Sequence, residues 1–128
     1  MTHKKHQIII CLASNENQEQ NLKAAREQLS LLLSDLHLTS EQWTEPIHSI
    51  CPAPYLNQLC KAKTDFSLNL TNEVLKEIEK RQGRTHNEDG IVTIDLDLLQ
   101  YDDELLHIRD WERDYVKNLI SELWENYC

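Results

Sequence analysis

Apolar side chains recur along this chain with the period of a helix in three segments. Between residues 17 and 36 they come at steps of three and four, which is typical of an amphipathic helix. The residues concerned are Leu22, Ala25, Leu29, Leu32, Leu33 and Leu36. Residues 71–82 predict a second helix, with Thr71 as its N-cap and Gly83 just beyond its end. Residues 109–127 predict a third helix.

Four other segments favour β-strands. Residues 7–13 form an apolar and β-branched run that is typical of a buried strand. Residues 38–49 predict a second strand, which Pro46 interrupts, and residues 55–66 predict a third. Residues 92–99 predict the last strand, because polar and apolar side chains alternate along them.

The order of these segments is β-α-β-β-α-β, followed by an extra helix. It predicts an α+β protein of the ferredoxin-like type, in which an antiparallel sheet carries its helices on one face. The other face is expected to stay free, with a site at the end of the sheet near Ser14 and Tyr55. The chain has the length of one domain, so residues 1–128 are expected to form a single unit.

Charge and composition exclude several classes of partner. The formal net charge is −9, whereas proteins that bind nucleic acid need a cationic surface, so we expect no nucleic-acid partner. The longest apolar run, which starts at Ile8, is too short for a signal peptide or a membrane span, so we expect no membrane partner. The four cysteines lack the spacing of zinc ligands and favour reduced thiols in the cytoplasm.

Two carboxylates stand one residue apart in the last predicted strand, at Asp95 and Asp97. Side chains alternate along a strand, so both should point away from Ile94, Leu96 and Leu98 and lie about 6.6 Å apart. Such a pair suits Mg²⁺, which usually takes one or two carboxylates and completes its shell with water and phosphate oxygens. Polar alternation is also what any half-solvated antiparallel strand shows, so both interpretations stay open.

Five short segments, spread over nearly the whole chain, carry a family resemblance. They are Ile10-Cys11-Leu12-Ala13-Ser14-Asn15, Tyr55-Leu56-Asn57, Ile78-Glu79 with Gln82-Gly83-Arg84, Ile94-Asp95-Leu96-Asp97-Leu98-Leu99, and Glu112-Arg113-Asp114-Tyr115-Val116. In this order, and on these predicted elements, they resemble the 6-hydroxymethyl-7,8-dihydropterin pyrophosphokinase family of folate biosynthesis. The chain resembles a short and divergent member of that family.

The resemblance implies a reaction. In the family, pyrophosphate passes from ATP to 6-hydroxymethyl-7,8-dihydropterin and AMP is released. The resemblance implies that Asp95 and Asp97 bind two Mg²⁺ ions and that these two aspartates and Arg84 are the catalytic residues. Metal ions can neutralise charge on the phosphate oxygens, while the protein mainly positions the reactants.

The resemblance also implies which residues contact each substrate. For ATP they are Glu79, Arg84, His86, Leu98, His107 and Arg113, and for the pterin they are Pro46, Tyr55, Asn57 and Tyr115. Arginine suits phosphate because it donates hydrogen bonds in pairs, and an amide offers a pterin both a donor and an acceptor. Without the resemblance, Glu79 and Arg84 would be solvated residues at a helix end, and Tyr115 a core residue.

The loop at residues 85–92 departs from the family pattern because it lacks arginines. Val92 stands where a phosphate-binding arginine is expected, His86 replaces another basic residue, and Glu88 and Asp89 add negative charge. A like-charge contact at 4 Å costs about 4 kcal/mol at an effective dielectric of 20. The alternative function is therefore a catalytically degenerate homologue that binds a pterin, a nucleotide or a protein without turnover. A self-associating interaction module is a third interpretation, and the oligomeric state stays open.

Overall fold

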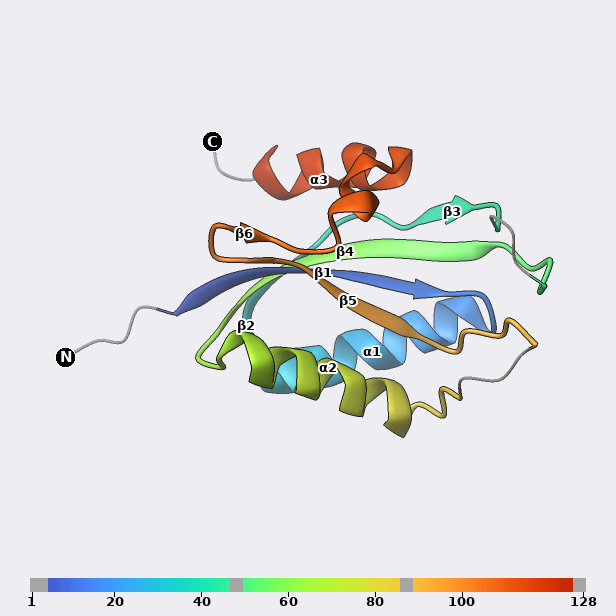
Figure 1. Cartoon of the computed structure of the whole chain (residues 1–128), viewed down its shortest axis with the longest axis horizontal. Coiled ribbons are helices and arrows are strands. Elements are labelled where there is room, and N and C mark those ends of the chain that lie inside the picture. Colours follow the sequence, from blue (N-terminus) through green and yellow to red (C-terminus); the bar gives the residue numbers. More distant parts are fainter. Residues whose placement is uncertain (1–4, 47–49, 86–88, 126–128) are drawn as a thin grey trace.

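The computed structural model describes residues 5–46, 50–85 and 89–125. Its strands are β1 (His6–Ser14), β2 (Ser34–Leu38), β3 (Gln42–Thr44), β4 (Tyr55–Thr64), β5 (Asp95–Tyr101) and β6 (Glu104–Leu105). Its helices are α1 (Gln18–Leu32), α2 (Leu68–Arg81), the 3-10 helix η1 (Ile108–Glu112) and α3 (Asp114–Glu125). Within the described residues, the strands form one antiparallel sheet in the order β2-β4-β1-β5-β6, and β3 also pairs with β4. The predicted α+β class is confirmed (Figure 1).

The face of the sheet toward α1 and α2 carries an aliphatic core. The core takes alternate residues of the strands and the apolar stripe of α1: Ile8, Ile10, Leu12, Leu22, Ala25, Leu29, Leu56, Cys60, Ile94, Leu96 and Leu98. Ile94, Leu96 and Leu98 are at most 1% exposed, which confirms the alternation predicted for this segment. The aspartates between them must therefore point to the opposite face.

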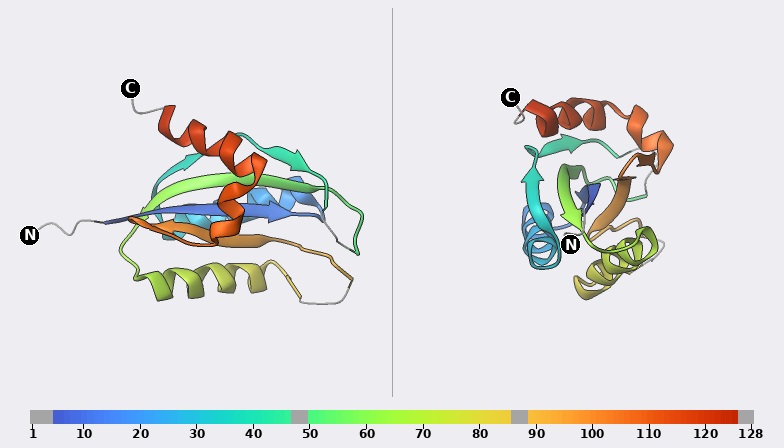
Figure 2. Two further views of the ribbon diagram at one scale, coloured as in Figure 1. Left: turned by 45° about the horizontal axis from the view of Figure 1, so that its top comes forward. Right: turned by 90° about the vertical axis from the view of Figure 1, so that its left-hand side faces the viewer.

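The opposite face is covered by α3, so the expectation that it would stay free is wrong (Figure 2). The apolar stripe of α3 packs on residues of the strands that point to this side: Tyr115, Val116, Leu119 and Leu123 lie against Ile9, Cys11, Leu59 and Leu99. The central strand β1 is apolar on both faces, which requires cover on both faces. The last helix therefore closes a second core.

Hydrogen bonds of two side chains, Trp111 and Glu122, hold this C-terminal segment in place. The indole Nε1 of Trp111 donates to the carbonyls of Leu99 and Leu106, both at 3.1 Å. At the other end of α3, the Glu122 carboxylate accepts hydrogen bonds from the backbone N–H and the hydroxyl of Ser40, both at 2.8 Å. The segment that carries Tyr115 is thus held at β5 on one side and at the connection between β2 and β3 on the other.

The first predicted helix is too long. α1 ends at Leu32, and β2 begins two residues later, at the edge of the sheet. Leu33 and Leu36 still pack against the core on the helix side, so the leucine spacing carries a helical period into a strand. The strand predicted over residues 38–49 is confirmed only in part, because β3 lies within it and ends at Thr44, whereas β2 begins earlier, at Ser34. Residues 47–49 lie outside the described residues.

The second helix begins one turn earlier than predicted. Its N-cap is Ser67, whose side chain accepts a hydrogen bond from the Leu70 N–H at 3.2 Å. Thr71 lies inside the helix, and its buried hydroxyl donates to the Ser67 carbonyl at 2.8 Å. The predicted stop is confirmed, since Gly83 follows the helix with a φ of 92°, a conformation that favours glycine.

In the C-terminal part of the chain, the boundaries of the last strand and the last helix differ from the predicted ones. β5 begins at Asp95, later than the predicted residue 92, and a tight turn leads from it to β6. The helix predicted over residues 109–127 is divided into η1 and α3. In the described part of the chain, no helix is long and apolar enough to cross a membrane, and Cys11, Cys51 and Cys60 are free thiols.

Candidate active site

A cavity of about 210 Å³ opens on the face of the sheet that carries α3, where β1 ends and β5 begins. Four strands and the C-terminal segment contribute to it. The lining residues are Cys11 and Ala13, Thr44 and Glu45, Tyr55 and Asn57, Asp95 and Asp97, and Asp110, Arg113 and Tyr115. The cavity thus joins parts of the chain that are distant in sequence.

The strand register explains why a cavity forms here. Ala13 pairs with Asn57 on one side and with Asp95 on the other, and Cys11 pairs with Asp97. Asn57 and Asp95 are therefore two strand spacings apart, about 10 Å. Only a methyl group lies between them on the central strand. The small side chain of Ala13 leaves room for a ligand between an amide and a carboxylate.

Six of the site residues predicted from the sequence meet at this cavity. They are Asp95, Asp97, Arg113, Tyr55, Asn57 and Tyr115. The first three belong to the predicted metal and ATP sites, and the others to the predicted pterin site. Residues from the two predicted sites therefore line one cavity.

Other predicted residues lie elsewhere. Leu98 is in the core on the opposite face, so only its backbone could reach a ligand in the cavity. His107 is exposed and caps η1 in a left-handed conformation. Pro46 is described but does not line the cavity, although its neighbour Glu45 does. His86 lies outside the described residues.

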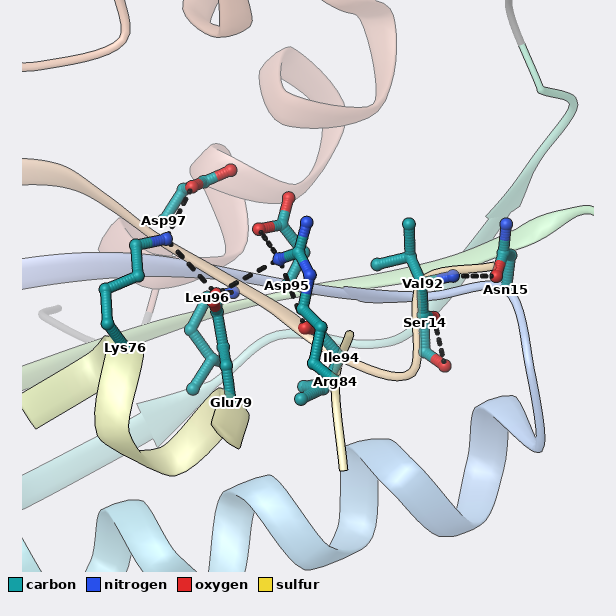
Figure 3. Close-up of polar contacts among 10 residues, drawn as sticks. All are labelled: Ser14, Asn15, Lys76, Glu79, Arg84, Val92, Ile94, Asp95, Leu96 and Asp97. Carbon is teal, nitrogen blue, oxygen red and sulfur yellow. Dashed lines mark hydrogen bonds and ion pairs between the residues drawn. The ribbon is translucent and has the colours of Figure 1, made fainter. Parts of the chain in front are cut away.

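Arg84 and Glu79 form an ion-pair network behind the cavity, between α2 and β5 (Figure 3). Arg84 Nη1 lies 2.7 Å from Asp95 Oδ1 and 3.4 Å from Glu79 Oε2. Glu79 Oε2 also accepts a hydrogen bond from the Leu96 N–H at 2.7 Å. Because Glu79 is only 3% exposed, its carboxylate is a buried connection between helix and strand. The network fixes the position of Asp95.

The charged form of Asp97 is disfavoured in the folded protein, and this is called electrostatic strain below. Burial, and then the negative charge of Asp95, raise the pKa of Asp97 from 3.8 to about 7, although the nearby Lys76 ammonium lowers it. Lys76 Nζ lies 3.9 Å from Asp97 Oδ1. The strain arises because two carboxylates share one partly buried place, as in other carboxylate pairs. A cation bound between them would relieve it.

The donor set fits a cation that brings its own ligands. Among the described residues, no group of three or more histidine, cysteine, aspartate or glutamate side chains could hold a metal ion. Asp95 and Asp97 offer carboxylate oxygens that face the cavity. Mg²⁺ usually binds to one or two carboxylates, together with water and phosphate oxygens. The pair therefore suits Mg²⁺ that arrives with a phosphate compound.

The other wall of the cavity has aromatic and amide groups. The Asn57 amide nitrogen donates to the Gln42 carbonyl at 3.0 Å and to Thr44 Oγ1 at 2.9 Å. These contacts orient the amide and leave its oxygen as an acceptor for a ligand. Tyr115 OH lies 3.7 Å from Cys11 Sγ, and burial raises the pKa of this thiol to about 12, so Cys11 is an inert part of the wall.

Asn15 holds the segment that leads into β5 (Figure 3). Its amide nitrogen donates to the Gly90 carbonyl at 2.9 Å, and its amide oxygen accepts from the Val92 N–H at 2.7 Å. Its own N–H donates to the Val92 carbonyl at 3.0 Å. Asn15 is 3% exposed and its partners are half-buried, so these bonds are partly shielded from water. Val92, which replaces an expected arginine, is thus held through its backbone.

We expect Asn15→Ala to lower the free energy of unfolding by about 2 kcal/mol, because the partly buried backbone groups of Gly90 and Val92 lose their hydrogen bonds. Asn15→Asp keeps the acceptor for Val92 but loses the donor for Gly90, so a smaller loss is expected. Urea unfolding measures both effects, with Asn118→Ala on the exposed surface of α3 as control. Equal stability of Asn15→Ala and the control would show that the hydrogen bonds of the Asn15 side chain contribute nothing to stability.

Several residues of the site were not predicted from the sequence. Thr44 and Asp110 line the cavity, and Lys76 lies beside Asp97. Two of them carry a signal in the sequence, since Lys76 precedes Glu79 and Asp110 precedes Arg113 by three residues. That is ion-pair spacing on a helix, and both pairs are present. Such spacing is common on solvated helices, so it does not by itself indicate a site.

Paired carboxylates, the neighbouring Arg84 and Arg113, and an aromatic wall are groups that suit a metal-bound phosphate and a flat ring, as in proteins of the phosphoryl-transfer class. A family model identifies the particular family. Residues 9–125 match the model of 7,8-dihydro-6-hydroxymethylpterin-pyrophosphokinase (HPPK), and the chain belongs to this family. The predicted family is therefore confirmed. A comparison with curated proteins finds no match.

Proposed function

We propose that this protein transfers pyrophosphate from ATP to 6-hydroxymethyl-7,8-dihydropterin in the folate pathway. The observation that carries the proposal is the meeting of six predicted residues at one cavity, with the carboxylate pair on one side and the aromatic and amide groups on the other. Membership of the HPPK family supports the same reaction. A ferredoxin-like topology is part of the proposal, with β2 and β3 together taking the place of its second strand.

In the proposed reaction, the hydroxyl oxygen of the pterin forms a bond to the β-phosphorus of ATP. The bond from that phosphorus to the oxygen shared with the α-phosphate breaks, and AMP leaves with that oxygen. The hydroxyl proton passes to water. Asp95 and Asp97 would hold the two Mg²⁺ ions of the family, which neutralise charge on the phosphate oxygens.

The remaining side chains position the reactants. Arg84 keeps Asp95 in place through its contact at 2.7 Å. Arg113, which is half-exposed and pairs with Asp110 at 3.5 Å, can turn toward a phosphate at the mouth of the cavity. Tyr55 and Tyr115 would lie against the pterin ring, and the Asn57 amide oxygen would accept one of its N–H groups. Roles for Glu79, Leu98, His107, His86 and Pro46 stay predictions.

We expect the protein to release AMP from Mg-ATP only when 6-hydroxymethyl-7,8-dihydropterin is present. Nucleotide chromatography of the reaction mixture measures this directly. The pterin dependence separates the proposed transfer from simple hydrolysis of ATP. If saturating substrates gave no AMP above a protein-free blank, the catalytic proposal would be lost.

The charge of the cavity favours one alternative, binding without turnover. Glu45, Asp95, Asp97 and Asp110 line it, and among the described residues Arg113 is the one cation that does so. A polyphosphate needs more cationic partners than this, or more metal. Calorimetric binding of the pterin or nucleotide without AMP release would support this alternative. The cytoplasmic location stays a prediction.

A further inference from the structure

Lys76 is a cation beside the candidate site for which no role was predicted. It lies on α2, and its ammonium is 3.9 Å from Asp97 Oδ1 and 3.3 Å from Glu79 Oε2 (Figure 3). The side chain is 56% exposed, whereas that of Asp97 is 22% exposed. Lys76 thus reaches from the helix surface to the edge of the carboxylate pair.

We propose that Lys76 is the counter-ion of Asp97 in the ligand-free protein and binds a phosphate group when metal and nucleotide are present. The inference rests on the proposed function. It assigns to Lys76 part of the positive charge that the loop at residues 85–92 lacks. In this way one side chain serves the site in both states.

The contacts of Lys76 leave it able to move. Its partner Glu79 Oε2 has two further contacts, the Leu96 N–H at 2.7 Å and Arg84 Nη1 at 3.4 Å, so Glu79 does not depend on Lys76. The distance of 3.9 Å to Asp97 is too long for a hydrogen bond. Half-exposed ion pairs of lysine are weak, and the side chain has a flexible four-carbon stem. Apart from its one hydrogen bond, to Glu79 Oε2 at 3.3 Å, little therefore holds the ammonium in its present place.

The position of Lys76 couples metal binding to phosphate binding. A divalent cation on Asp97 would lie close to the ammonium, whose nitrogen is 3.9 Å from Asp97 Oδ1. The two positive charges would repel each other. The metal alone is thus opposed by Lys76. A polyphosphate that arrives with the metal supplies negative charge to both cations and removes the conflict. Lys76 would then weaken binding of the free metal and strengthen binding of the metal–nucleotide complex.

Lys76→Gln should therefore change two affinities in opposite directions. For Mn²⁺ alone, measured by electron paramagnetic resonance, we expect affinity to increase about 5-fold. For a Mg-bound ATP analogue that cannot be cleaved between the α- and β-phosphates, measured by calorimetry, we expect affinity to fall about 10-fold. Lys80→Gln, an exposed lysine one turn further along α2, removes the same charge and should leave both affinities within about 2-fold.

The outcomes separate this inference from the proposed function. If Lys76→Gln weakens Mn²⁺ binding, or leaves binding of the nucleotide analogue unchanged while the wild type releases AMP, the role of Lys76 is wrong and the proposed function stands. If the wild type binds the analogue but releases no AMP, the proposed turnover fails and the two affinities still decide the role of Lys76. A wild type that binds no nucleotide overturns both. Equal effects of Lys80→Gln would show a general charge effect and overturn the specific role.

Discussion

Asp97→Asn is expected to lower the rate of AMP release at least about 1,000-fold, because it removes the negative charge of a carboxylate that would bind Mg²⁺. Through the metal, that charge stabilises the transition state by several kcal/mol. The substitution keeps the shape of the side chain, so the strand and the cavity are preserved. Asp95 remains bound to Arg84 at 2.7 Å and cannot replace the missing charge. The rate is measured as pterin-dependent AMP release at saturating Mg-ATP.

The same variant is expected to be more stable than the wild type at pH 8 without metal. The pKa of Asp97 is raised from 3.8 to about 7 in the folded protein, so folding favours the protonated carboxyl. The associated stability is fully present below pH 4 and is lost as the pH rises through 7. A difference of one pKa unit is equivalent to about 1.4 kcal/mol. Asp97→Asn should therefore raise the free energy of unfolding by up to about 4 kcal/mol at pH 8 and leave it nearly unchanged near pH 4.

Thermal unfolding at the two pH values measures this difference. Asp103→Asn is the matched control, because it makes the same change at an exposed position in the turn after β5. The control should leave both activity and stability unchanged. Retention of activity by Asp97→Asn would remove the carboxylate pair from the mechanism, and equal stability at pH 8 would show that Asp97 is not strained.

Glu79→Ala is expected to lower the free energy of unfolding by about 3 to 5 kcal/mol, since it leaves the mostly buried Arg84 cation without one of its anions. It also leaves the Leu96 N–H without its acceptor at 2.7 Å. Both losses occur where α2 meets β5. A change of this size is a large part of the stability of a domain of this length.

Glu79→Gln separates the two contributions, because it keeps an acceptor for Leu96 and loses only the charge. We expect a loss of about 1 to 3 kcal/mol for this variant. Glu77→Ala is the control on the same helix; its carboxylate is half-exposed and pairs only weakly with Arg81 at 3.5 Å, so less than about 0.5 kcal/mol is expected. Urea unfolding of the three variants gives the values. A loss for Glu79→Ala no greater than that for Glu77→Ala would contradict the buried network.

The parts of the fold that could be predicted from the sequence are those that a local pattern determines. The apolar and β-branched run at residues 7–13 predicted a buried strand, and Gly83 marked a helix end through its own backbone preference. The alternation around Asp95 and Asp97 fixed their common face. In each of these cases the signal lies within a few residues of the element that it describes.

The parts that could not be predicted depend on contacts between distant segments. Leu33 and Leu36 keep a helical spacing although they lie in and beside a strand, because both still reach the same core. The docking of α3 on the face opposite α1 and α2 depends on residues of β1 and β4. Cys11 of β1, for example, precedes Tyr115 by 104 positions in the chain. Lys76 and Arg84 join the site only because α2 packs beside β5.

The register that places Ala13 between Asn57 and Asp95 also divides the site into two parts with different dynamics. β1 is paired along its length with β4 and β5, and backbone hydrogen bonds in such a central strand break only when the whole domain unfolds. η1 has no buried residue, and Gly90 and Val92 are held by hydrogen bonds with Asn15 and Ser14. η1 contributes Asp110 to the wall of the cavity and is held mainly through Trp111, so local opening of this wall costs less than any movement of the floor. A ligand would enter by displacing η1 over a floor that keeps its shape.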